Sequence, residues 1–410
     1  MTNRTLALAV ALVSVAVLGL GAPVGPKAYH VATTGSDTNP GTATQPFKTI
    51  TKAVSVVLPG DSILVHAGTY PAVVTINKSG TSALPITLAG AGDGVALIKP
   101  NLPTASCSAT VATRDRAIQI YSADYWTITG LSIAGGILVY GNNQHKIASF
   151  TSRTLPGRGV YDPTAAATLL PKLGVDPADH IRILNNKITG RGIQSLASRW
   201  GEVTGNEISN TACGTGAFIW INRFSDFWKV TNNYIHDNAV SAEHRMEEGI
   251  RQGSGSSYNL IANNLVENLA NRGRGITTDV MSSWNVIQGN TVRRAYHGFN
   301  EQHGGWGNQW IGNLSEFNRK FGMSIDGKDG GLTSPNDGVP AKIVFRCNVA
   351  RNNGKTDLSV GAVQQSSFSN NAFGSVKLDA GVRTYWSRVG NTWDGSSAMP
   401  PTNPPQKTCS

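Results

Sequence analysis

The chain has 410 residues, with 35 Lys and Arg against 25 Asp and Glu, which gives a formal net charge of +10. With 40% hydrophobic and only 15% charged residues, the composition is that of a globular protein with a sizeable core. The positive charge favours an anionic partner, such as an acidic polysaccharide, nucleic acid or a membrane surface, and the scattering of the basic residues weakens the case for nucleic acid.

Residues 1–22 have the pattern of a secretory signal peptide. Arg4 supplies one early positive charge, an apolar stretch runs from Leu6 to Leu20, and the small residues Gly21 and Ala22 follow. An uncleaved membrane anchor is the alternative. No later stretch is apolar for long enough to cross a membrane. We therefore expect an extracellular or periplasmic protein, without membrane contact once the signal is cleaved.

The segment 28–70 is expected to cap the N-terminal end of the fold. Apolar residues in 47–57 follow a helical spacing, which predicts a short amphipathic helix covering exposed strand edges. Pro59, Gly60 and Asp61 then turn the chain into a first strand, 62–68. The apolar positions of the predicted helix are Phe47, Ile50, Ala53, Val54 and Val57.

From residue 181 onward, one short pattern is repeated at intervals of 20 to 35 residues. Each copy has alternating apolar residues, an Asn, a short apolar pair, a polar turn, and a Gly that opens a second alternating run. A fixed unit with variable insertions indicates a solenoid, and the alternation indicates strands. We therefore predict a parallel β-helix over 28–397, with stacked Asn side chains at one corner; a β-sandwich is the alternative. The anchor residues are Asn186, Asn206, Asn233, Asn264, Asn290, Asn313, Asn348, Asn371 and Asn391.

Two insertions and a tail interrupt this pattern. Residues 144–179 and the segment after Met323 contain Pro- and Gly-centred turns, and such insertions often border a binding groove. Residues 398–410 are Pro-rich and are not expected to pack. The four cysteines allow three disulfide pairings, and none has the spacing of a zinc site.

The N-terminal segment also resembles that of a known group of proteins. Its motifs occur in secreted right-handed parallel β-helix proteins of the pectate-lyase-like superfamily, and the resemblance implies that fold and an N-terminal cap. It does not select an activity, because lyases, epimerases, hydrolases and non-catalytic proteins share the segment. The matching residues are Gly35-Ser36-Asp37, Asn39-Pro40-Gly41-Thr42, Pro46-Phe47-Lys48-Thr49-Ile50, Gly60-Asp61 and Gly68-Thr69-Tyr70.

The Gly-apolar step sets the phase of the second strand in each coil. On this phase an apolar stack faces inward: Ile193, Ala217, Ile250, Ile276, Phe299 and Met323. The next residue of each coil faces outward: Gln194, Phe218, Arg251, Thr277, Asn300 and Ser324. The residues before each Gly form a further outer column of Glu248, Arg274, His297 and Phe321. Glu301 would face inward, as a buried polar residue or as a sign that the register slips by one.

The outward positions contain the densest titratable cluster of the chain. Equivalent positions in adjacent coils lie about 5 Å apart, so these residues are expected to share one groove. The cluster favours β-elimination, in which a cation neutralises a uronate carboxylate and a base removes the C5 proton. We assign catalysis to Arg251, Arg272, Arg274 and His297. Substrate contacts are assigned to Asp279, Asn300, Gln302, His303, Trp220 and Lys328, and a calcium ion to Glu247 and Glu248.

This arrangement loosely resembles the alginate lyase and chondroitinase B group, where a Glu-x-Glu pair binds calcium, a Lys acts as base and an Arg as acid. Glu248 matches the second Glu. The sequence departs from the pattern at Met246 and Gly253, and Thr278-Asp279 stands where the Arg would be. We therefore predict a monomeric polysaccharide lyase. The alternatives are a hydrolase using Glu248 with Asp279 or Asp279 with Asp326, a uronate C5-epimerase, and a non-catalytic glycan-binding β-helix.

Overall fold

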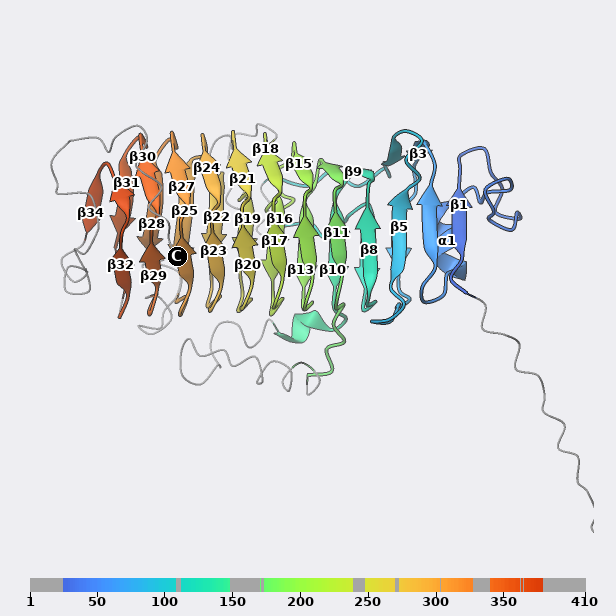
Figure 1. The fold of residues 1–410 in the computed structure, drawn as a ribbon, viewed down its shortest axis with the longest axis horizontal. Helices are drawn as coiled ribbons and strands as arrows, with labels where there is room; N and C mark the ends of the chain where they lie inside the picture. Colours follow the sequence, from blue (N-terminus) through green and yellow to red (C-terminus); the bar gives the residue numbers. More distant parts are fainter. Residues whose placement is uncertain are drawn as a thin grey trace, which may run out of the picture.

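The computed structural model describes residues 25–107, 112–147, 170, 173–238, 248–269, 273–302, 304–326, 340–361, 363 and 365–378, with Ile147 and Asp326 described for their backbone only. The chain forms a solenoid whose coils lie side by side along its long axis, from the blue N-terminal end to the red C-terminal end (Figure 1). Three parallel sheets run along it, and each regular coil adds one strand to each. The predicted parallel β-helix is confirmed.

We call the three sheets A, B and C, in the order in which each coil visits them. Sheet A contains β1 (Ala28–Val31), β2 (Ser62–Val65), β5 (Ile86–Gly90), β8 (Trp126–Thr129), β11 (Arg182–Leu184), β14 (Glu202–Thr204), β17 (Lys229–Thr231), β20 (Leu260–Ala262), β23 (Val286–Gln288), β26 (Gln309–Ile311), β29 (Val344–Arg346) and β32 (Ser367–Ser369). Sheet B contains β3 (Gly68–Tyr70), β6 (Ala96–Ile98), β9 (Ser132–Ala134), β12 (Lys187–Thr189), β15 (Glu207–Ser209), β18 (Tyr234–His236), β21 (Leu265–Glu267), β24 (Thr291–Arg293), β27 (Leu314–Glu316), β30 (Val349–Arg351) and β33 (Ala372–Phe373).

Sheet C carries the side chains from which the site is built. Its strands are β4 (Val74–Ile76), β7 (Ile118–Tyr121), β10 (Ile137–Tyr140), β13 (Ile193–Leu196), β16 (Ile219–Asn222), β19 (Ile250–Gln252), β22 (Arg274–Thr278), β25 (His297–Gln302), β28 (Phe321–Asp326), β31 (Thr356–Val360) and β34 (Val376–Leu378).

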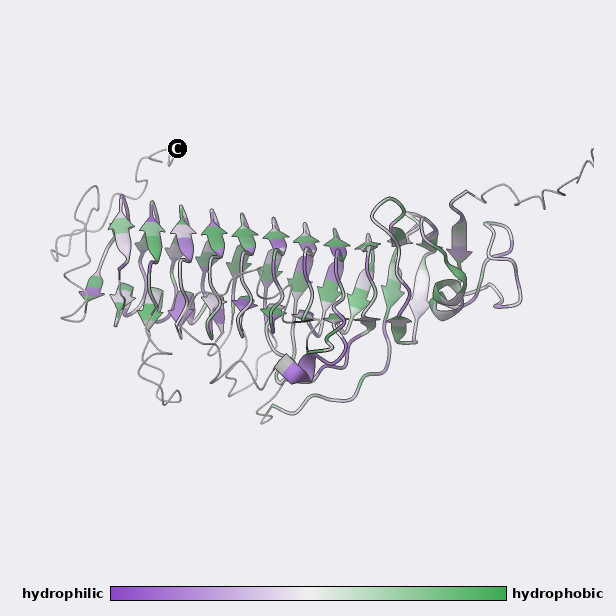
Figure 2. Cartoon of the chain, turned by 90° about the horizontal axis from the view of Figure 1, so that it is seen from below, coloured by the Kyte–Doolittle hydropathy of each residue, from purple (hydrophilic) through white to green (hydrophobic). Residues whose placement is uncertain are grey.

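The core is the interior of the solenoid, where inward residues of each sheet stack from coil to coil. In sheet B, Ile188, Ile208, Ile235 and Val266 occupy the same register position and are fully buried. Apolar strands recur in every coil along the axis (Figure 2). Because each short strand is hydrogen-bonded to both neighbouring coils, the core grows with coil number rather than with a single large interior.

The recurrent Asn residues form a ladder at the corner between sheets A and B. The side-chain carbonyl of each one accepts hydrogen bonds from the backbone N–H and the side-chain amide of the Asn in the preceding coil, as between Asn264 and Asn290 at 3.0 and 2.9 Å. The ladder runs from Asn186 to Asn371; Asn391 lies outside the described residues. The residue before each ladder position has left-handed backbone, for example Asn263 and Gly289.

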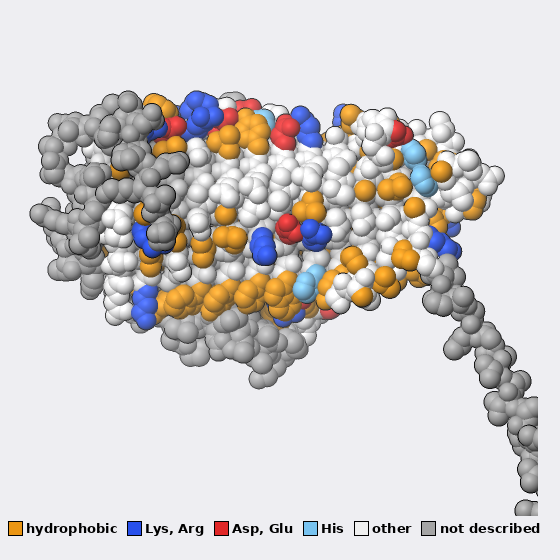
Figure 3. Space-filling view, viewed as in Figure 1, with side chains coloured by type: hydrophobic (Ala, Val, Ile, Leu, Met, Phe, Trp, Pro, Cys, Tyr) orange, Lys and Arg blue, Asp and Glu red, His pale blue; other side chains and the backbone are white. Residues whose placement is uncertain are grey.

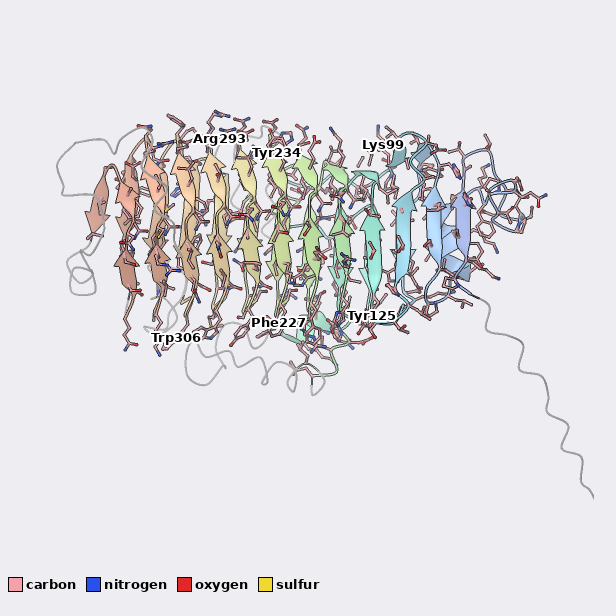
Figure 4. All side chains as sticks on the ribbon, in the orientation of Figure 1. Lys99, Tyr125, Phe227, Tyr234, Arg293 and Trp306 are labelled. Carbon is pink, nitrogen blue, oxygen red and sulfur yellow. A yellow bond between two sulfur atoms is a disulfide. The ribbon has the colours of Figure 1, made fainter. Side chains whose placement is uncertain are left out.

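A second row of residues lines the corner between sheets C and A. Aromatic rings stack there face to face, with centroids 4.5 to 5.8 Å apart. Apolar side chains form a band along this edge (Figure 3), from which Tyr125, Phe227 and Trp306 project (Figure 4). Trp200 stacks between His180 and Phe227, so its ring faces are occupied. Trp228 and Trp310 are core residues.

The N-terminal cap contains the expected helix. α1 (Ile50–Val56) begins after Thr49, whose hydroxyl accepts a hydrogen bond from the Lys52 backbone N–H at 3.1 Å. It buries Ile50, Ala53 and Val54 and packs on β1, β2 and β4. The cap therefore covers the N-terminal coils as predicted.

The insertions and termini are only partly described. Residues 144–147 form the 3-10 helix η1 (Gln144–Ile147), and a disulfide joins Cys107 to Cys213. The signal peptide at 1–22, most of 144–179, and the tail at 398–410 lie outside the described residues. Within the described ranges, no helix has the length and apolar character needed to cross a bilayer.

The register of sheet C agrees with the prediction in all but one coil. Ile193, Ile250, Ile276, Phe299 and Met323 stack inward. In the coil of β16, however, Ile219 pairs with Ile193 and Ile250, so the assignments of Ala217 and Phe218 were wrong. Both are buried before the strand begins, because the chain turns into β16 two residues later than the Gly-apolar step suggests.

Glu301 faces into the solenoid, so the register does not slip there. Its carboxylate accepts hydrogen bonds from the side chains of Thr278, Asn308 and Trp310. Burial nevertheless raises the pKa of Glu301 to about 7, against the opposing effect of these donors. A protonated carboxyl group is therefore part of the core at mildly acidic pH.

We expect this group to make the fold less stable as the pH rises. Between pH values of about 4.5 and about 7 the folded chain binds more protons at Glu301 than the unfolded chain, so stability is lost across this window, by on the order of 3 kcal/mol. Glu301→Gln cannot ionise and should lack this loss. Urea unfolding of both proteins at pH 5 and pH 8 measures the difference; equal pH dependence in the two would contradict the assignment.

Candidate active site on the outer face of sheet C

Two outward columns of sheet C bring together residues that are far apart in the sequence. Glu248, Arg274, His297 and Phe321 lie in successive coils at one column. Trp220, Arg251, Thr277, Asn300 and Ser324 lie at the other. Two residues further along, Gln302 ends β25 and Asp279 follows directly after β22. The predicted juxtaposition of Glu248, Arg274 and His297 on one face is therefore confirmed.

We keep the name groove, given above to the expected site, for the residues of these two columns together with Asp279 and Gln302. Arg251 joins two carboxylates of the groove. Its guanidinium forms an ion pair with Asp279 and lies 3.7 Å from Glu248. Burial alone would lower the pKa of Arg251, but Glu248 and Asp279 outweigh it and raise the pKa above its ordinary value. A raised pKa makes Arg251 unsuitable as the base among the residues assigned to catalysis. It is a permanent cation that holds Glu248 and Asp279 in place.

Arg274 and His297 are neighbours in adjacent strands. Arg274 donates a hydrogen bond to the Gln302 side-chain carbonyl at 2.8 Å and lies 3.7 Å from Glu248, while about a third of its side chain stays exposed. Burial, followed by the charges of Arg274 and Lys320, lowers the pKa of His297 to about 3. His297 is therefore a neutral imidazole at physiological pH.

The outer face of sheet C also holds a concentration of buried polar atoms that have no hydrogen-bond partner among the described residues. In most proteins such atoms are paired, so a cluster of them marks a place where a ligand or ordered water binds. They come from five adjacent strands, β13 to β25, and from Glu248, just before β19. The atoms are Gln194 Oε1, Trp220 Nε1, Glu248 Oε2, Arg251 Nε, Thr277 Oγ1, His297 Nδ1 and Asn300 Oδ1.

Comparison with known proteins places the chain in a family. The family model described as Pel9A-like, right-handed β-helix region, matches residues 29–327. The chain belongs to this family. No curated protein matches the sequence.

Two solved structures show the same Pel9A-like architecture at low sequence identity. The complex of XylC with xylose is 14% identical, with a TM-score of 0.54 over 84% of this chain and 75% of that one. Pectate lyase Pel9A is also 14% identical, with a TM-score of 0.52 over 92% of this chain and 82% of that one. At these identities the likeness shows the fold alone.

The other predicted site residues of this Pel9A-like chain are distributed as follows. Asn300 lies in the groove and donates to the Ser324 hydroxyl at 2.6 Å. Trp220 lies under the Arg251 guanidinium, 5.3 Å from the ring centroid, so one of its faces is occupied. Arg272, His303, Lys328, Glu247 and the side chain of Asp326 lie outside the described residues, and their assignments stay predictions.

The assignment of a calcium ion to Glu247 and Glu248 stays a prediction, because Glu247 lies outside the described residues. Calcium requires several oxygen ligands, but the charged neighbours of Glu248 are the cations Arg251 and Arg274. Among the residues that the structure describes, no three His, Cys, Asp or Glu side chains converge to hold a metal. Glu248 instead forms ion pairs with Arg251 and Arg274.

Sequence reasoning missed three residues beside the groove. Backbone hydrogen bonds place Tyr296, Lys320 and Lys355 in one column of successive coils, immediately before the column of His297 and Phe321. Tyr296 and Lys320 directly precede His297 and Phe321 of the predicted outer column. Lys355 precedes Thr356, which pairs with Phe321. The signal was available for Tyr296 and Lys320 by extending the outer column one residue backwards.

Proposed function

We propose that the protein is a secreted enzyme that cleaves a uronic-acid-containing polysaccharide by β-elimination in the groove of sheet C. The observation that carries this proposal is the pairing of a partly exposed cation, Arg274, with a neutral and only partly exposed imidazole, His297. The partnerless polar atoms around them and the family membership support a polysaccharide site at this position.

Each group has one role in this reaction. Arg274 binds the uronate carboxylate and stabilises the negative charge that develops on it when the C5 proton leaves. His297 takes that proton, the C4–O bond breaks, and a double bond forms between C4 and C5. The imidazolium is a strong acid here, so it returns the proton to the departing oxygen. Arg251 positions Glu248 and Asp279.

A hydrolase using Glu248 with Asp279 is less well supported. Hydrolysis needs one carboxylic acid free to protonate the leaving group and one carboxylate free to act as base or nucleophile. Both carboxylates form ion pairs with Arg251 instead. An epimerase would share proton abstraction with the lyase, and a binding protein would need neither step, so the products decide among these alternatives.

The first test follows the product. We expect incubation with polygalacturonate, alginate, glucuronan or a glycosaminoglycan to generate the ultraviolet absorbance of unsaturated uronate with at least one of them. Arg274→Ala should reduce kcat/KM by about 100- to 1,000-fold, because a charge-stabilising donor is lost. Arg293→Ala is the matched control, since Arg293 pairs with Glu267 on sheet B, at the edge shown in Figure 4.

Other products would redirect the proposal. New reducing ends without the absorbance would mean hydrolysis, an altered uronate without chain cleavage would mean epimerisation, and no product with retained binding would mean a glycan-binding protein. Equal losses in Arg274→Ala and Arg293→Ala would remove the groove from the mechanism.

A further inference from the structure

A pair of lysines lies beside the groove without acidic partners. Lys320 and Lys355 occupy adjacent coils, with the Lys355 backbone N–H donating to the Lys320 carbonyl at 2.8 Å. Among the described residues, neither side chain forms an ion pair. Because their backbones lie one coil apart, both positive charges are available to one anion.

On the neighbouring sheet B, the arginine side chains pair with carboxylates of the chain itself. On sheet B, Arg293 and Arg294 share Glu267, and Arg351 pairs with Glu316. Those carboxylates come from adjacent coils and neutralise the arginines. Lys320 and Lys355 have aromatic neighbours instead, which attract a cation without cancelling its charge.

The aromatic rings fix the position of the pair. Lys320 Nζ lies 5.4 Å from the ring centroid of Tyr296 and 5.1 Å from that of Phe321, and Lys355 Nζ lies 5.6 Å from Phe321. The Phe321 ring in turn meets His297 edge-on at 5.0 Å. One ring thus separates the two ammonium groups from the imidazole of the groove.

We infer that Lys320 and Lys355 form a subsite for the carboxylate of a second uronate, next to the sugar held at Arg274 and His297. The inference rests on the proposed function, because it takes the anion to be part of the same polysaccharide. Arg274, His297 and Phe321 follow the solenoid axis toward its C-terminal end, so the polymer lies along the axis. The site then requires carboxylates on neighbouring sugars, which selects polyuronates over chains with isolated acidic units.

The test measures binding separately from cleavage. Gel electrophoresis through polygalacturonate, alginate or glucuronan should retard the protein, and methyl-esterified pectin should not. Lys355→Ala should raise KM for the retarding polymer about 10-fold or more while leaving kcat at saturation unchanged, because Lys355 contacts no reacting atom. Lys355→Arg should restore most of the binding.

The pH profile of Lys320→Ala distinguishes a role in the site from a purely structural role of this lysine. Because its charge helps to lower the pKa of His297, Lys320→Ala should move the acidic limb of the kcat/KM profile to higher pH, in addition to weakening binding. Lys342→Ala is the matched control: Lys342 also lies over an aromatic ring, Trp306 at 4.8 Å, but at the opposite edge of the solenoid.

The outcomes separate this subsite from the proposed reaction. Unchanged retardation in the Lys320→Ala, Lys355→Ala double variant, or equal retardation by methyl-esterified pectin, would overturn the subsite even if elimination occurs. Retardation that depends on both lysines without unsaturated product would uphold the subsite and refute the elimination. A protein that no polyuronate retards would refute both.

Discussion

Replacing His297 with glutamine is expected to lower kcat by about 100- to 10,000-fold, the range that a positioned general base contributes. Glutamine retains a polar side chain beside Arg274 but cannot accept the C5 proton. Its effect should fall on kcat rather than KM, because the proposed carboxylate contacts are made by arginine and lysine. Turnover under saturating polyuronate is the measurement, and a variant with more than a tenth of the original kcat would contradict the role.

The pH dependence gives His297 a second signature. Its lowered pKa means that the imidazole stays neutral down to a pH of about 3, so kcat/KM should not fall between pH 7 and pH 5 through this residue. Between the ordinary pKa of 6.5 and about 3 the unfolded chain binds the proton and the folded chain does not. The contribution of His297 to stability is therefore fully present above pH 6.5 and is lost as the pH falls through this window.

His297→Gln should remove this acid sensitivity and so gain stability relative to the unmodified protein at pH 4. At pH 4 the difference has an upper bound of about 3 kcal/mol, because about 2.5 pH units of the window that begins at 6.5 have then been crossed. Urea unfolding of both proteins at pH 4 and pH 7 measures it. An acidic limb near pH 6.5, or equal acid sensitivity in the variant, would place His297 in a solvated rather than a buried setting.

The fold could be predicted from the sequence because one constraint is repeated. The ladder residue must supply two amide donors and one acceptor in every coil, and Asn meets this requirement. The Asn therefore recurs in the sequence even where the turns between strands differ in length. Glu301 was correctly phased inward for the same reason. The β16 coil was wrong because the run before Ile219 is apolar throughout, and alternation alone cannot say where its strand begins.

The site was predicted less completely, for electrostatic reasons. Column positions follow from the register, so Glu248, Arg274 and His297 could be placed together. The direction of the pKa shift of Arg251 could not be predicted. Burial lowers this pKa and two nearby carboxylates raise it, and the sequence does not give the distances that decide which effect is larger. Arg251 and His297 are both crowded by charge, yet their pKa values move away from their ordinary values in opposite directions.

Replacing Asn290 with alanine tests the ladder on which this register depends. Asn290 is fully buried, accepts two hydrogen bonds from Asn264 and donates to the Ile261 backbone carbonyl at 2.8 Å and to Asn313 at 3.0 Å. Alanine would leave several of these buried groups without partners, each at about 1–3 kcal/mol. We expect the free energy of unfolding to fall by roughly 3–6 kcal/mol in urea titrations.

The residue beside the ladder is the matched control. Asn263 immediately precedes Asn264, is exposed, and has a φ of 56° in the left-handed region. The equivalent position in the next coil is Gly289, with a φ of 63°. Because the fold already accepts glycine there, Asn263→Gly should cost only a few tenths of a kcal/mol. If the two substitutions destabilise the protein equally, the loss of an asparagine at this corner matters but the ladder does not, and the shared register of the coils must be maintained by the core alone.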